Sequence, residues 1–137
     1  MKFSGSNIRK KRNDRLPHDG EHEAVLAKIA KAHKETGDYL VLTFKLADGR
    51  LVPFWAMLKP SAGHEDLEDL SYRHQALIAD FLMATLGTDE VDDLLSALEK
   101  AKEKPVLVTT RQSQKQQQTR VNVDAFRAAD AVKEGGK

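Results

Sequence analysis

The chain has 137 residues, 40% of them hydrophobic, with a formal net charge of +1 and no cysteine. This length is typical of one domain, and the lack of cysteine excludes disulfide bonds and thiolate metal sites. No apolar run approaches the roughly 20 residues of a membrane span, and the first residues do not resemble a signal peptide, so we expect a cytoplasmic protein without membrane contact.

The near-neutral total charge hides a segregated distribution. Residues 1–15 carry six Lys or Arg against one acid, and residues 104–137 carry seven against three. Residues 64–103 carry eleven acids against three Lys or Arg. This segregation permits a polyanionic partner at the basic segments, while the acidic block also fits the solvated faces of helices.

The first fifteen residues are polar and basic without an apolar period, which predicts a flexible arm. Its basic cluster at 9–12 suits either phosphate contact or a solubilising tail. Residues 16–20 are typical of a turn. The stretch 21–34 suits a helix or a strand, and the hairpin that follows it favours a strand. We expect one domain over residues 16–130 and a frayed end over 131–137.

Residues 39–58 form the clearest pattern, a β-hairpin with Asp48-Gly49 at an expected tight turn. Alternation divides its side chains between two faces. The apolar face is expected in the core and holds Leu40, Leu42, Phe44, Leu46, Val52, Phe54, Ala56 and Leu58. The other face mixes Tyr39 and Trp55 with lysines, so it is either covered or binds a ligand. Pro53 indicates a free edge or a bulge, and a one-residue slip there would bury Trp55 and expose Phe54.

Two helices are predicted after the hairpin. Apolar residues at spacings of three and four indicate an amphipathic helix that Asp66 can cap and that stops at Gly87. Thr88 is placed to cap a second helix, whose apolar stripe consists of Val91, Leu94, Leu95 and Leu98.

The last part of the chain returns to β structure. Pro105 ends the second helix, and the apolar runs 106–110 and 120–126 predict two strands around a glutamine-rich loop. The predicted order is therefore three strands, two helices and two strands. This is the element order of the OB-fold, a partly open barrel that binds oligonucleotides, although other five-stranded folds share this order. We therefore expect an α+β, mostly β fold: a five-stranded OB-like barrel with a two-helix insertion between strands 3 and 4.

Four short patterns recur in a known family: Gly20-x-x-Glu23-Ala24-Val25, Thr36-Gly37-Asp38-Tyr39-Leu40-x-Leu42-Thr43-Phe44, Leu82-Met83-Ala84-Thr85-Leu86-Gly87 and Val121-Asn122-Val123-Asp124-Ala125-Phe126. Through them residues 19–130 resemble phage and prophage proteins, long known as a domain of unknown function and taken to be OB-like single-stranded-DNA-binding proteins. His22 stands where that family usually has an aromatic residue. The resemblance implies single-stranded DNA binding in phage DNA replication or recombination, in the cytoplasm of a bacterial host.

Single-strand binding requires cations for phosphates and aromatic faces for bases. Trp55 and Tyr39 are the candidate platforms, although Trp55 also suits a core position and Tyr39 the cover of an edge. The candidate cations flank the hairpin, follow the first strand or bracket the glutamine-rich loop. They are Lys45 and Lys59; Lys28, Lys31 and Lys34; and Arg111, Lys115 and Arg120.

Catalytic motifs such as the Walker loop, G-x-S-x-G and H-E-x-x-H are absent from the sequence, so we expect no enzyme, cofactor or metal site. The leading hypothesis is a non-catalytic single-stranded-DNA-binding protein, whose oligomeric state is left open. Its acidic helices, residues 64–103, could recruit replication or recombination proteins or pair with the basic arm. The alternatives are a protein–protein module, such as a phage inhibitor of a host factor, and a small assembly protein.

Overall fold

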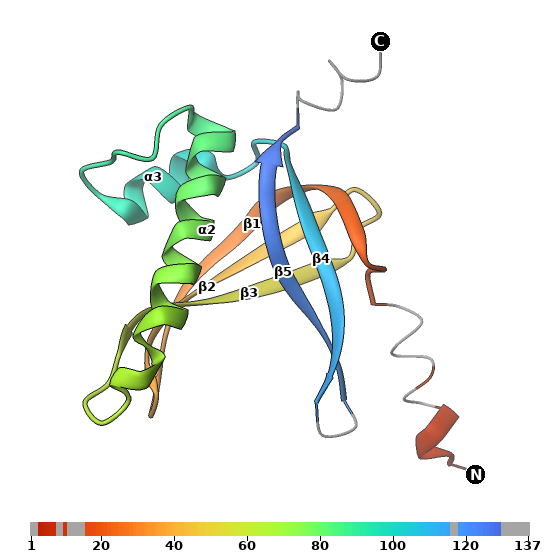
Figure 1. The fold of residues 1–137 in the computed structure, drawn as a ribbon. Helices are drawn as coiled ribbons and strands as arrows, with labels where there is room; N and C mark the ends of the chain where they lie inside the picture. Colours follow the sequence, from red (N-terminus) through yellow and green to blue (C-terminus); the bar gives the residue numbers. More distant parts are fainter. Residues whose placement is uncertain (1–2, 8–9, 11–15, 116–117, 130–137) are drawn as a thin grey trace.

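The computed structural model describes residues 3–7, 10, 16–115 and 118–129, apart from the side chains of residues 115 and 118. Strands and helices follow in the order shown in Figure 1. They are β1 (Gly20–Lys34), β2 (Gly37–Leu46), β3 (Leu51–Pro60), the 3₁₀ helix η1 (Glu65–Leu67), α2 (Glu68–Leu86), α3 (Leu94–Ala101), β4 (Val106–Lys115) and β5 (Gln118–Ala128).

The described strands form one five-stranded antiparallel sheet in the order β3-β2-β1-β4-β5. Strand β1 belongs to both halves, because Gly20–Ala24 pairs with β4 and Ala24–Lys34 pairs with β2. In Figure 1 the β4–β5 pair crosses in front of β1, β2 and β3. The expected mostly β, α+β arrangement is confirmed. Closure into a barrel is not seen, since β3 and β5 are the two edges of the sheet.

Helix α2 covers one edge of this open sheet. It packs against both β3 and β5, and three of its side chains bind the backbone of β3. The Met57 N–H donates to Nδ1 of His74 at 3.0 Å, and Leu58 O accepts from Ser71 Oγ at 3.0 Å and from Gln75 Nε2 at 3.1 Å. These bonds satisfy groups that an edge strand would otherwise leave unpaired.

The core lies between the strands and α2, and four phenylalanine rings form its centre. Phe126 of β5 lies 5.1 Å from Phe44, 5.4 Å from Phe81 and 6.1 Å from Phe54, measured between ring centroids. Phe44 and Phe81 meet edge to face at 5.4 Å, a favoured geometry for aromatic pairs. One cluster of rings therefore joins β2, β3, β5 and α2.

The predicted hairpin is confirmed, but its turn differs. Residues 47–50 connect the strands, so the connection is longer than a two-residue primed turn. The Gly49 N–H donates to Leu46 O at 2.9 Å, and the Leu46 N–H donates to Arg50 O at 2.8 Å. With Gly49 at a φ of 92°, this bonding is typical of a hairpin loop that ends in a glycine bulge.

The two helices differ from their predicted starts. Leu67, not Asp66, precedes the first residue of α2, and α2 ends as predicted, with Gly87 in the left-handed conformation. Thr88 does not cap α3. Its hydroxyl accepts the Glu90 N–H in a local turn, and α3 begins only after Asp93.

In the described part of the chain, no helix is long and apolar enough to cross a membrane. Within the predicted arm, residues 5–7 lie in a short helical turn. The predicted frayed end, residues 131–137, lies outside the described residues.

Candidate nucleic-acid interface

Trp55 lies on the outer face of the β1–β2–β3 region, the face that also carries Val41 and Tyr39. Its register partner is Val41, whereas Phe54 pairs with Leu42 and is only 6% exposed. The slip considered at Pro53 has therefore not occurred, and 40% of Trp55 is exposed. Trp55 therefore lies on the solvent side of the sheet and not in the core.

Two neighbours hold the Trp55 ring. The Tyr39 ring meets it edge to face, with centroids 5.9 Å apart and planes at 69°. The Tyr39 hydroxyl forms a 2.6 Å hydrogen bond with Oγ1 of Thr36, which fixes the ring that supports Trp55. The Lys34 ammonium lies over Trp55, 4.3 Å from the ring centroid, within the range of a cation–π contact.

A groove of about 830 Å³ adjoins Trp55. Residues from Leu51 to Trp55 of β3 and residues 119–124 of β5 line its two sides, so it occupies the gap between the edges of the open sheet. Residues from Leu70 to Asp80 of α2 also line it. The groove exists because the sheet does not close at this point.

Four cations line this groove: Lys34, Arg73, Arg111 and Arg120. Arg111 is paired, with its Nε 3.3 Å from a carboxylate oxygen of Asp124. Among the described residues, no ion pair involves Lys34, Arg73 or Arg120. The groove therefore has cations that are available to a polyanion.

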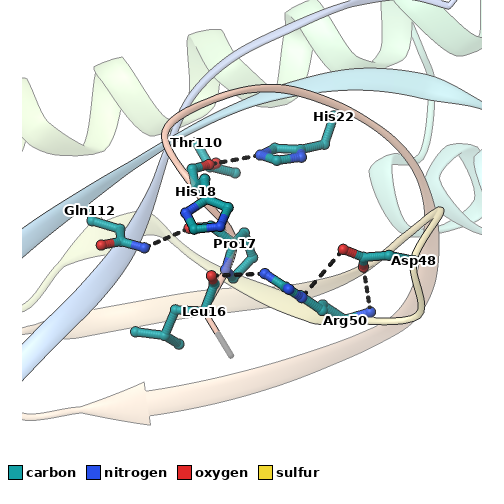
Figure 2. Close-up of polar contacts among 8 residues, drawn as sticks. All are labelled: Leu16, Pro17, His18, His22, Asp48, Arg50, Thr110 and Gln112. Carbon is teal, nitrogen blue, oxygen red and sulfur yellow. Dashed lines mark hydrogen bonds and ion pairs between the residues drawn. The ribbon is translucent and has the colours of Figure 1, made fainter. Parts of the chain in front are cut away.

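A short segment before β1 completes the lining with Leu16 and Pro17. Figure 2 shows how backbone carbonyls fix this segment to the hairpin loop and to β4. Leu16 O accepts from Arg50 Nη1 at 2.9 Å, Pro17 O from Gln112 Nε2 at 2.8 Å, and His18 O from Thr110 Oγ1 at 2.9 Å. Leu16 and Pro17 are therefore held beside the groove.

The structure brings together about half of the predicted site residues. Lys34, Trp55, Arg111 and Arg120 line the groove, and Tyr39 supports Trp55. The other lysines with described side chains do not line it: Lys28, Lys31, Lys45 and Lys59. The side chain of Lys115 lies outside the described residues.

Sequence reasoning missed Arg73, which occurs within a block that was interpreted as acidic. Arg73 is the only Lys or Arg in α2. It precedes His74, which binds the Met57 N–H of β3, so only the position of α2 against the sheet shows that Arg73 lies at the groove. Helical geometry then places its long side chain at the groove.

His74 forms part of the same wall. Burial lowers the pKa of its imidazole below the ordinary 6.5, and the neighbouring Arg73 adds to this effect. Its ring also meets Phe54 edge to face at 5.4 Å. A neutral imidazole can accept the Met57 N–H, which agrees with the observed contact.

Among the described residues, no group of three or more His, Asp or Glu side chains is placed to hold a metal ion. His18 and His22 do not converge on a shared point: His22 Nε2 donates to the backbone carbonyl of His18 at 2.8 Å. Neither a family model nor a curated protein matches the chain.

Proposed function

We propose that the protein binds single-stranded DNA without catalysing a reaction, and that the strand lies in the groove between β3 and β5. The observation that supports this proposal is the position of Trp55, a partly exposed aromatic residue beside a groove that is also lined by Lys34, Arg73 and Arg120. A base can stack on the ring while the cations contact the flanking phosphates. This pairing of chemistries is typical of proteins that bind single strands with little sequence preference.

The same geometry favours a single strand over a duplex. Stacking of a base on an aromatic side chain is worth about 1–3 kcal/mol, but the base must be unpaired and turned outward. In a duplex the faces of the bases are already stacked on one another, so only the cations of the groove would contribute. We expect duplex binding to be weaker and almost wholly electrostatic.

We also infer that the fold is OB-like, with the helices inserted between β3 and β4. The strand order and the pairing of β1 with both β2 and β4 support this inference. OB-folds bind oligonucleotides on strands 2 and 3 between the loops that connect strands 1–2 and 4–5. Here Trp55 lies on β3, with Lys34 before the first of those loops and Arg120 after the second.

The biological setting follows from the sequence resemblance alone. We propose a phage-encoded protein that supports DNA replication or recombination in the cytoplasm of a bacterial host. Short unpaired stretches occur in both processes, and a binder that does not read sequence would protect them.

Fluorescence titration tests the proposed binding. Oligo(dT) is expected to quench Trp55, and the affinity is expected to fall steeply between 50 and 200 mM salt. A hairpin duplex with the same number of phosphates should bind more weakly and leave the fluorescence nearly unchanged. If oligo(dT) does not bind even at low salt, the proposal is wrong.

A second candidate function is a protein–protein module, which the exposed side of α2 favours. Tyr72 is 60% exposed and donates a hydrogen bond to Glu68 at 2.8 Å, and Met83 is 49% exposed. Aromatic residues and methionine are enriched in protein interfaces. Capture of a defined protein partner that resists nuclease and high salt, without any oligo(dT) binding, would favour this function over the first.

A further inference from the structure

We propose that Lys34 covers the stacking face of Trp55 in the free protein, and that the groove therefore selects ligands that carry an aromatic base and a phosphate in one unit. This inference rests on the proposed function and specifies its ligand.

Lys34 lies at the end of β1, close to the rings of Trp55 and Tyr39. Lys34 is the last residue of β1, and only two residues separate it from β2. Its Nζ lies 4.3 Å from the Trp55 centroid and 5.8 Å from the Tyr39 centroid, so the ammonium is shared unequally between the two rings. In the described part of the chain, no carboxylate forms an ion pair with Lys34.

The Trp55 ring can contact either the Lys34 ammonium or a base, and the stronger of these two contacts forms. A cation–π contact at an exposed site changes an equilibrium constant by about two- to fivefold. A stacked base is worth about 5- to 150-fold. A base can therefore replace the ammonium on Trp55, provided that the displaced charge finds another partner.

The phosphate of the same nucleotide is that partner. An ammonium displaced from the ring can move to a phosphate oxygen, which gives a charge-assisted contact stronger than a neutral one. A base without phosphate would displace the ammonium into water and gain less. A phosphate chain without bases would attract Lys34 but leave Trp55 unstacked. Only a nucleotide unit satisfies both groups together.

Lys34→Ala tests the cover, and Lys45→Ala is the matched control. Lys45 is also an exposed strand lysine, so both variants lose one positive charge. Unlike Lys34, it does not line the groove. In the free protein, acrylamide quenching of Trp55 fluorescence reports access to the ring. We expect quenching to increase in Lys34→Ala and to stay at the wild-type level in Lys45→Ala. Unchanged quenching in Lys34→Ala would overturn the cover.

Binding experiments then test the selectivity. Oligo(dT) should bind the wild-type protein about 5- to 150-fold more tightly than an abasic strand with the same number of phosphates. Lys34→Ala should reduce the slope of log affinity against log salt by about 0.7, the change expected for one lost phosphate contact on a single strand. Lys45→Ala should leave the slope unchanged.

Two failures can be told apart. If neither strand binds at low salt, the proposed function is wrong, whatever the quenching shows. If oligo(dT) and the abasic strand bind equally well, or if both variants reduce the salt slope alike, DNA binding stands and the selective cover is wrong.

Discussion

His74 is the side chain at which α2 meets the backbone of β3. Its Nδ1 accepts the Met57 N–H at 3.0 Å, and burial lowers the pKa of the imidazole. A protonated imidazole has no lone pair for that N–H, so protonation removes the contact and places a charge beside Arg73. The residue thus links the protonation state to the stability of the groove wall.

We expect the free energy of unfolding to fall as the pH drops below about 6.5. The unfolded chain binds the proton of His74 near the ordinary value of 6.5, whereas the folded protein binds it only at lower pH. Well above pH 6.5 both states are neutral and His74 has no pH-dependent effect. Urea unfolding at pH 8, 6 and 5 measures the change.

His74→Asn provides the control for this pH dependence. The Asn oxygen takes approximately the place of Nδ1 and can accept the Met57 N–H, but it does not titrate. The variant should lose less stability than the wild type between pH 7 and 5. An equal loss in both proteins would show that another group is responsible.

At the residue scale, alternation predicted most of the hairpin. Leu40, Leu42, Phe44 and Leu46 are all buried, and Trp55 lies on the opposite face. Met57 is different. Alternation places it on the same face as Trp55, yet it is fully buried. Met57 lies beside a bulge at Leu58, and its N–H contacts His74 of α2; neither feature depends on the hairpin sequence alone. The arrival of a distant helix cannot be predicted from local alternation.

At the scale of elements, α2 stabilises β3 through buried hydrogen bonds. Ser71 is 2% exposed, and its hydroxyl lies 3.0 Å from Leu58 O and 3.3 Å from Met57 O. Ser71→Ala should reduce the free energy of unfolding by about 1 kcal/mol, because the hydrogen bond from the serine hydroxyl is lost. The loss is no larger because Gln75 still donates to Leu58 O. Urea denaturation measures this loss.

Ser96→Ala is the comparison for Ser71. Its hydroxyl donates to Asp93 at the exposed start of α3, at 2.6 Å. Water can replace that bond, so we expect a change within about 0.5 kcal/mol. Equal losses in the two variants would contradict a special role for the contact between α2 and β3.

The sequence predicted which elements exist better than where they begin. The five strands and the end of α2 at Gly87 follow from apolar period and turn residues. The late start of α3 does not, because Thr88 has two competing uses. It can cap a helix or bind the backbone two residues later, and the structure shows the second.

At the scale of the whole molecule, Phe126 joins the two halves of the sheet. It is 7% exposed and touches rings from β2, β3 and α2. Phe126→Ala should cost about 3–5 kcal/mol of unfolding free energy, through lost burial and the cavity that remains. Phe3→Ala, at a position 77% exposed, should change stability by less than about 0.5 kcal/mol. Similar midpoints for both variants in urea would contradict the role of this ring cluster.

The groove was the least predictable feature of the molecule. Sequence reasoning found Trp55, Lys34 and Arg120 as separate candidates, but it expected a barrel. The gap between β3 and β5 depends on how far the sheet curls and on where α2 packs, and these are properties of the assembled core. Arg73 could be assigned to the site only once α2 had been placed.

The position of β3 at the edge of the sheet also has a consequence for aggregation. An uncovered strand can recruit a strand from another molecule and begin aggregation. Pro53 has no N–H to donate to such a neighbour, and the Met57 N–H is already bound to His74. The edge that leaves the groove open is thus a poor template for intermolecular sheets, so the molecule keeps an accessible cleft without exposing a complete ladder.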